Sequence, residues 1–227
     1  MRVLWYIVMS IVAAWAAFSA IAALLVYLWV RERYGRGGPF PASQALSLVN
    51  PMRALLQPVA PAVRAFQLRP GDTVLEIGPG PGYFTVEAGR TVGAAGRIVC
   101  LDVQTGMIAT LRSRLDARGV ANARLLVGDA ISLPLADHCV DRAFLVAVIG
   151  EIPDRPQALS ELRRVMKPGG VLSIMETLTD CDYQLEDSVR DLCRATGFSV
   201  VDHQRRRLGY VMCFAAPTPG TSAAGLR

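Results

Sequence analysis

From Gly71 onward the chain alternates between short apolar runs and segments whose apolar residues recur with helical spacing. The apolar runs predict five strands: Thr73–Ile77, Arg97–Leu101, Ala123–Val127, Asp141–Val148 and Val171–Glu176. Strands that alternate with helices pair side by side in a parallel sheet, with the helices packed against its faces. The alternation therefore predicts an α/β domain with a mainly parallel sheet.

Two of the segments between the strands carry an apolar stripe that predicts a helix facing the core. The stripes are Met107, Ile108, Leu111 and Leu115 in the first, and Leu159, Leu162 and Val165 in the second. The chain then ends on "FSVVDHQRRRLGYVMCFAAP", two apolar runs around a basic turn with Gly209. This pattern predicts a C-terminal antiparallel hairpin and brings the expected number of strands to seven.

The N-terminal segment from Val3 to Val30 contains 28 consecutive residues without a charge. A helix of that length exceeds the roughly 30 Å hydrocarbon core of a bilayer, so we expect one transmembrane helix. A cleaved signal peptide is the alternative, but its apolar core is normally only about 7–15 residues long. Arg31, Arg33 and Arg36 follow the segment and only Arg2 precedes it. The excess of arginine predicts that the rest of the chain lies in the cytoplasm.

These features divide the chain into four parts: an anchor with its flank (1–36), a linker with short amphipathic helices (37–67), the α/β domain (68–217) and a disordered tail (218–227). Pro58 and Pro61 prevent one continuous helix in the second part. Within it, Asn50–Phe66 is expected either to form a lid over a site or to pack on the edge of the sheet.

The charges and cysteines exclude several classes of function. The net charge is +5, but residues 1–38 hold four Arg and one Glu, and no long basic stripe follows. We therefore expect no nucleic-acid partner. The five cysteines form no CxxC pair and only two histidines are present, so no metal site is expected and the thiols are expected to be reduced.

The sequence "TVLEIGPGPGYFT", residues 73–85, joins the first predicted strand to a glycine-rich turn. A phosphate-binding P-loop requires Lys-Ser/Thr after the glycines, and here Tyr83-Phe84-Thr85 follows Gly82. The dinucleotide pattern GxGxxG is absent as well, because the spacing is GxGxG and two prolines remove backbone N–H donors. The turn is therefore expected to hold a ligand by shape, with little phosphate contact.

Four blocks carry a resemblance to a known family: "VLEIGPGPGYFT", "IVCLDVQTGMI", "LLVGDAISLPLADHCVDRAF" and "ELRRVMKPGGVLSIMET". In this order and spacing, the chain resembles the class I S-adenosylmethionine-dependent methyltransferases, a group that includes ubiquinone/menaquinone and small-molecule methyltransferases. The resemblance covers about Leu68 to Pro217. It implies a Rossmann-like fold with helices on both faces of the sheet, and S-adenosyl-L-methionine as cofactor.

The resemblance also implies roles for individual residues. Gly78, Gly80 and Gly82 would pack against the methionine part of the cofactor with Glu76 nearby, and Asp129, Ala130 and Ile131 would lie beside the adenine. Asp102 would accept hydrogen bonds from both ribose hydroxyls, with Val103 next to it, unless it only caps the following helix. Val146 to Gly150 would lie where the transferred methyl group points.

A general base is needed only when the methyl acceptor must lose a proton. Glu151 is the first candidate for that role, with capping of the next helix or simple exposure to solvent as its alternatives. His203, Glu176 and Asp182 are weaker candidates. The membrane anchor favours a lipophilic acceptor such as a quinone precursor or an aminolipid. An NAD-dependent oxidoreductase and a catalytically inactive cofactor-binding scaffold remain as alternative functions, and the oligomeric state stays open.

Overall fold

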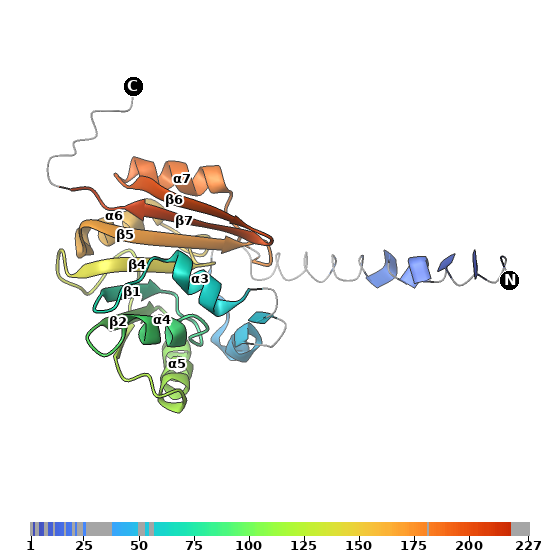
Figure 1. Ribbon diagram of the computed structural model, residues 1–227, viewed down its shortest axis with the longest axis horizontal. Helices are drawn as coiled ribbons and strands as arrows, with labels where there is room; N and C mark the ends of the chain where they lie inside the picture. The colour runs from blue at the N-terminus through green and yellow to red at the C-terminus, as the bar shows by residue number, and fades with distance from the viewer. Residues whose placement is uncertain are drawn as a thin grey trace, which may run out of the picture.

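The computed structural model describes residues 38–49, 53–54, 57–180 and 182–218, together with scattered residues between 2 and 25. The helical elements are η1 (Ala42–Val49), α3 (Val59–Ala65), α4 (Thr85–Val92), α5 (Thr105–Ala117), α6 (Arg155–Val165) and α7 (Glu186–Ala195). The strands are β1 (Thr73–Ile77), β2 (Arg97–Asp102), β3 (Ala123–Val127), β4 (Val140–Val146), β5 (Met166–Thr177), β6 (Ser199–Arg206) and β7 (Gly209–Ala215). Figure 1 shows one layered body built around the sheet.

The seven strands form one sheet in the order β3-β2-β1-β4-β5-β7-β6. The five strands from β3 to β5 are parallel, whereas β7 pairs antiparallel with both β5 and β6. The predicted parallel sheet and the C-terminal hairpin are therefore confirmed. The chain reverses its direction of travel across the sheet between β1 and β4, and such a reversal opens a crevice at the carboxyl ends of the strands.

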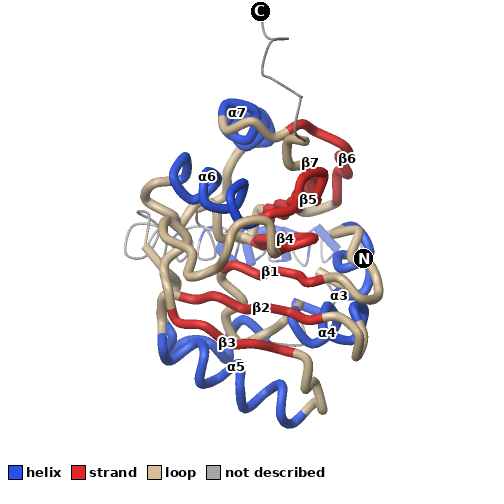
Figure 2. The backbone as a smooth tube through the Cα atoms, turned by 90° about the vertical axis from the view of Figure 1, so that its left-hand side faces the viewer, coloured by secondary structure: helices blue, strands red, loops and turns tan. Residues whose placement is uncertain are grey.

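Helices cover both faces of the sheet, as Figure 2 shows. On one face α6 and α7 pack against alternate strand residues such as Leu75 and Ile77. On the other face α3, α4 and α5 pack against residues of the opposite parity, such as Val74. This division follows from the two-residue period of a strand. Both predicted apolar stripes are buried, that of α5 and that of α6.

Two strands differ from their predicted limits by two residues or more. β4 ends at Val146, two residues early, because Ala147 adopts a φ of +53° and turns the chain out of the sheet. β5 begins five residues early, at Met166, which pairs with Val140. Gly169 and Gly170 then hydrogen-bond to Ala216, so the loop-like sequence "KPGG" stays attached to the sheet.

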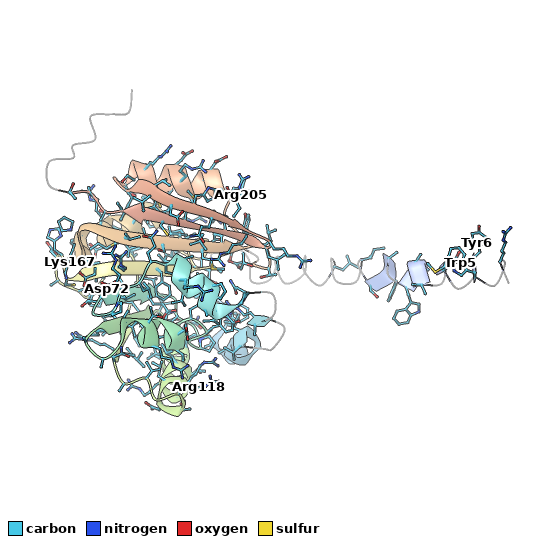
Figure 3. All side chains as sticks on the ribbon, in the orientation of Figure 1. Trp5, Tyr6, Asp72, Arg118, Lys167 and Arg205 are labelled. Carbon is cyan, nitrogen blue, oxygen red and sulfur yellow. The ribbon has the colours of Figure 1, made fainter. Side chains whose placement is uncertain are left out.

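An ion pair joins the starts of β1 and β4. Asp72 Oδ2 accepts a hydrogen bond from Arg142 Nε at 2.8 Å, and the two side chains are 15% and 8% exposed. Next to it, Asp141 accepts from the Thr73 N–H and pairs with Lys167. Asp72 and Lys167 lie at the end of the sheet away from the N-terminus, as Figure 3 shows.

The predicted anchor, residues 1–36, lies largely outside the described residues. Those that are described between 2 and 25 are helical, and their large apolar side chains are exposed, Trp15 and Phe18 among them at 70% and 69%. In the part of the chain that the structure describes, no helix has both the length and the apolar character needed to cross a membrane. The predicted tail also lies outside that part beyond Thr218.

Candidate functional site

A cavity of about 1040 Å³ opens at the carboxyl ends of the parallel strands. Its walls include residues from the ends of β1, β2, β4 and β5, from the loop after β3 and from the β6–β7 turn. This is the place where the strand order reverses, between β1 and β4. Ligands of open α/β sheets bind in such crevices. The volume lies at the upper end of the roughly 300–1,000 Å³ usual for ligand pockets.

The glycine-rich turn after β1 forms one wall of the cavity. Gly78, Gly80 and Gly82 have φ angles of +66°, +52° and +81°, a region that favours glycine. A Cβ on Gly78 would lie 2.5 Å from a methyl group of Val148, so this position also needs the absence of a side chain. Gly78 and Gly80 line the cavity.

Gly82 does not reach the cavity wall. A Cβ there would lie 2.4 Å from Leu111 Cδ1, so its bare backbone allows the turn to pack on α5. The structure therefore does not bring Gly82 to the place where the resemblance puts a ligand contact.

Two aspartates follow each other along this wall, at the ends of neighbouring strands. Asp102 is the last residue of β2 and pairs in register with Val127 of β3, and Asp129 follows two residues later. Asp102 Oδ1 accepts the Gln104 N–H at 2.9 Å, and Asp129 Oδ1 accepts the Ile131 N–H at 3.1 Å. Burial raises the pKa of Asp102 above its usual value. Both carboxylates line the cavity and keep acceptor capacity for a ligand's hydroxyl or amino groups.

Asp102 is not the N-cap of the helix that follows. The N-cap of α5 is Gln104, which makes no side-chain capping bond. The structure therefore contradicts the capping alternative and leaves the carboxylate of Asp102 facing the cavity.

Of the other residues assigned by the resemblance, Glu76, Val103, Ala130 and Val146 to Val148 also line the cavity, whereas Ile131, Ile149 and Gly150 do not. Glu76 is almost fully buried, and burial raises its pKa to about 8. We refer to the wall formed by Glu76, Gly78, Gly80, Asp102 and Asp129 as the β1–β3 side of the cavity.

Four carboxyl groups line the cavity at the end of β5 and in the loops after β4 and β5: Glu151, Glu176, Asp180 and Asp182. We refer to these four residues as the β4–β5 side. Burial is the largest cause, and neighbouring carboxylates a further one, of the rise in the pKa of Glu151 and of Glu176 to about 8. The alternative role of Glu151 as a helix cap is wrong, because Asp154 is the N-cap of α6. Sequence reasoning did not single out Asp180.

The segment before the α/β domain covers part of the cavity. We refer to its described residues 38–49, 53 and 57 as the roof. Phe40 and Ala42 exchange backbone hydrogen bonds with the Gln104 side chain at 2.7 and 3.1 Å, and the Phe40 N–H lies 3.4 Å from Glu151 Oε2. Arg53 stacks on Tyr83, with its guanidinium carbon 4.4 Å from the ring centre.

The described residues of Asn50–Phe66 divide between the cavity wall and one face of the sheet, and the lid stays a prediction. Arg53 and Gln57 line the cavity, whereas α3 packs into the core through Phe66, which stacks on Phe144 at 4.7 Å. The sequence indicated Asn50–Phe66 as part of the site but did not indicate Gln104. The one signal for Gln104 was a polar residue directly after Asp102-Val103.

His203 lies on β6 away from the cavity walls, with Nε2 3.1 Å from Glu186 Oε2 on α7. Among the described residues, no cluster of His, Cys, Asp and Glu could hold a metal ion. The described cysteines, Cys100, Cys139, Cys193 and Cys213, are free thiols, and the fifth, Cys181, lies outside the described residues.

The comparison with protein families agrees with this geometry. Residues 75–174, which span β1 to β5, match the family model of a methyltransferase domain. A demethylmenaquinone methyltransferase from Bacillus cytotoxicus is 30% identical over 115 residues, 51% of this chain and 48% of that protein. The ubiquinone/menaquinone biosynthesis C-methyltransferase UbiE of Teredinibacter turnerae is 34% identical over 110 residues, 48% of this chain and 44% of that protein. The chain thus spans about half the length of the curated relatives it matches.

A solved structure supports the fold over a longer stretch. A crystal structure of a SAM-dependent methyltransferase from Aquifex aeolicus covers 78% of this chain and 99% of its own, with a TM-score of 0.74 and 24% identity. The family match leaves the NAD-dependent oxidoreductase without support. Residues 75–174 therefore form a methyltransferase domain of the S-adenosylmethionine-dependent class, with S-adenosyl-L-methionine as its methyl donor.

Proposed function

We propose that the whole chain is a membrane-anchored enzyme that transfers a methyl group from S-adenosyl-L-methionine to a small, lipophilic acceptor. The observation that carries the proposal is the cavity of about 1040 Å³, which both the β1–β3 side and the β4–β5 side line. One ligand of drug-like size fills only part of such a volume. The remainder is space for a second molecule beside the cofactor.

The residues of the β1–β3 side fit the cofactor. Gly78 and Gly80 leave a bare backbone surface at the end of β1, where a side chain would occupy the space. Asp102 and Asp129 hold their carboxylates through backbone N–H groups, so both are fixed before a ligand arrives. The bound cofactor supplies an activated methyl group on a sulfonium. The protein's own residues then have to orient the acceptor and exclude water, which the roof favours by closing over part of the cavity.

Two features support a membrane-associated acceptor. The described N-terminal residues present an exposed apolar surface, and in Figure 1 they lie on the side of the molecule where β5 ends and the β6–β7 turn projects. Arg206 and Arg207 of that turn line the cavity, which gives its rim a basic edge suited to an anionic membrane surface. The two relatives are named as methyltransferases of menaquinone or ubiquinone/menaquinone biosynthesis. A quinone precursor is one lipophilic acceptor of the class that we propose for this chain.

Cofactor binding is the first test. We expect the full chain in detergent micelles to bind S-adenosylmethionine and S-adenosylhomocysteine with micromolar affinity in a calorimeter and to show no heat with NAD. Binding of NAD alone would overturn the proposal. Binding of both adenosyl compounds without methyl transfer to any lipid extract would favour the inactive scaffold instead.

Deletion of residues 1–36 tests the membrane part. The shortened chain should keep its affinity for S-adenosylhomocysteine, because the β1–β3 side lies in the α/β domain. Its transfer of labelled methyl groups to acceptors in vesicles should fall, while transfer to the same acceptors in detergent should persist. Equal activity in both preparations would show that the anchor does not deliver the acceptor.

A further inference from the structure

The cavity is acidic although the chain as a whole is basic. Seven acidic and three basic side chains line it, whereas the net charge of the protein is +5. Three of the acidic residues, Glu76, Asp102 and Asp129, belong to the β1–β3 side that fits the cofactor. The other four form the β4–β5 side, and the cofactor contacts described above leave them without a function.

The β4–β5 side is built by close packing of two loops. A Cβ on Gly150 would lie 2.1 Å from the backbone oxygen of Asp182, so the missing side chain lets the loop after β5 lie directly against the loop after β4. The first residue of β7 packs closely against the end of β5 as well, because a Cβ on Gly209 would lie 1.9 Å from the backbone oxygen of Glu176. The segments that carry these carboxyl groups are thus held together by close backbone contacts.

Glu176 carries the strongest sign of a ligand. Its side chain is fully buried, at 0% exposure, and it lines the cavity. Oε2 accepts the Gln184 N–H at 3.0 Å, but Oε1 has no hydrogen-bond partner among the described residues. A buried carboxyl oxygen without a partner is costly, and a donor from a bound molecule would satisfy it.

The cations nearest to these carboxyl groups are engaged with other acceptors. Arg155 donates to Gln184 Oε1 at 2.8 Å and to the Gly150 oxygen at 3.2 Å. Arg53 donates to Gln57 Oε1 and to the Leu48 oxygen while it stacks on Tyr83, and it also interacts with Asp180. Neither arginine donates a hydrogen bond to the carboxylate of Glu176 or of Glu151 in the described part of the chain.

A metal ion is a poor occupant for this wall. The described residues contain no group of three or more His, Cys, Asp or Glu side chains placed to hold one. An organic cation does not need three ligating side chains around one point, because an ammonium group can donate its N–H groups to separate oxygens.

We propose that the β4–β5 side of the cavity is a subsite for the protonated amino group of the methyl acceptor, held by Glu176 and Glu151. This inference rests on the proposed function and narrows its acceptor to amines. Glu176 lies on β5, separated from β1 by β4 and hence by about 10 Å at the usual strand spacing. The amine therefore occupies a place of its own beside the cofactor. An aminolipid headgroup and a soluble amine share this chemistry.

Binding should release protons, since the empty site holds Glu151 and Glu176 with pKa values raised to about 8. The charged groups that face them are Asp102, Asp180 and Asp182, which raise these pKa values, and Arg155, which lowers that of Glu176. An ammonium group favours the ionised carboxylates, so both lose protons when it binds near neutral pH. Affinity for an amine should therefore increase between pH 6 and pH 8.

The test uses the full chain in detergent micelles, saturated with S-adenosylhomocysteine. Three probes are titrated in a calorimeter: dihexanoyl phosphatidylethanolamine, dihexanoyl phosphatidylglycerol and ethanolamine. We expect the amine-bearing lipid to bind at least about tenfold more tightly than the glycerol lipid, as a charge-assisted hydrogen bond provides. Glu176→Gln should remove that preference and reduce proton release, while the affinity for S-adenosylhomocysteine stays within about twofold.

Glu87→Gln on α4, outside the cavity, is the matched control and should change neither affinity. If ethanolamine binds as well as the lipid, the acceptor is a soluble amine, and if only the lipid binds, it is a headgroup. Binding of S-adenosylhomocysteine with no preference for either amine would overturn the subsite and leave the proposed methyltransferase standing. A tenfold loss of S-adenosylhomocysteine affinity in Glu176→Gln would show that Glu176 contacts the cofactor, and this result would also overturn the proposed amine subsite. Failure to bind S-adenosylhomocysteine at all would remove the proposed function itself.

Discussion

At the scale of single residues, Asp102 is the most direct test of the cofactor side. Replacement by Asn keeps an oxygen for the Gln104 N–H but removes the negative charge. Hydrogen bonds to a charged group contribute about 1.5–3 kcal/mol, so the dissociation constant of S-adenosylhomocysteine should rise by about tenfold or more. Calorimetry checks the value, and Asp116→Asn on the exposed face of α5 is the control. An unchanged constant would remove Asp102 from the binding site.

A second residue, Gly150, connects the two loops of the β4–β5 side. In Gly150→Ala the new methyl group would meet the Asp182 backbone at 2.1 Å, and a backbone cannot rotate away as a side chain does. Such overpacking costs about 1–3 kcal/mol of unfolding free energy. The KM for the acceptor should rise while the affinity for S-adenosylhomocysteine stays unchanged.

Thermal unfolding and steady-state kinetics measure both effects of that substitution. Gly119→Ala serves as the comparison, because this glycine has a φ of +66° but open space around it and lies outside the cavity. It should lower stability without changing the KM. A Gly150→Ala enzyme with wild-type KM would show that the loop after β5 does not form the acceptor site.

At the scale of elements, the buried ion pair between Asp72 and Arg142 joins the starts of β1 and β4. Asp72→Asn removes the carboxylate that is hydrogen-bonded to the buried guanidinium of Arg142, and breaking such a pair typically costs about 3–5 kcal/mol. Denaturant unfolding should show this loss. Asp137→Asn removes the 66% exposed partner of Arg164 and should cost less than about 1 kcal/mol. Equal losses in both variants would mean that the first pair contributes nothing beyond a surface contact.

Most helices and strands of the fold could be predicted from the sequence alone. Five parallel strands, the hairpin and both apolar stripes follow from periodicity, because the 2.0 and 3.6 residue repeats determine which side chains are buried. The early start of β5 does not follow from it, since "KPGG" reads as a turn and pairs only because Ala216, far along the chain, lies beside it.

The site divides in the same way. Asp102 and Asp129 were predictable because they lie at or just after the carboxyl ends of two strands of the parallel sheet, where side chains meet at one edge. Asp180 and the roof were not, because they reach the cavity through loops whose course depends on close contacts such as that of Gly150 with Asp182. The contact of Gly82 with Leu111 of α5 could not be predicted either, because it joins residues that are far apart in the sequence.

At the scale of the whole molecule, three carboxyl groups that line the cavity make stability depend on pH. Burial raises the pKa of Glu76, Glu151 and Glu176 from 4.5 to about 8, so the folded protein binds protons that the unfolded chain releases above about pH 4.5. Their stabilisation is complete below that pH and is lost as the pH rises toward 8. Each group should lower the unfolding free energy by up to about 1.4 kcal/mol per pH unit in this window.

Unfolding of the ligand-free protein at pH 5.5, 6.5 and 7.5 measures this slope. Asp141 and Glu161 have lowered pKa values, so their contributions change only in more acidic solution and do not interfere. Glu176→Gln should give a shallower slope than the wild type. A stability that increases with pH across this window, or an identical slope in the variant, would contradict the assignment of these three protons.

The excess of carboxyl groups around the cavity also has a consequence for turnover. Methyl transfer converts a positively charged sulfonium into a neutral thioether, so the attraction between the cofactor and the surrounding acids weakens at the moment of reaction. We therefore expect the cavity to discriminate between fresh and spent cofactor by charge, although the two molecules differ by a single methyl group. We expect the product to be a weak inhibitor at low salt, where this difference is least screened, and a stronger competitor as the ionic strength increases.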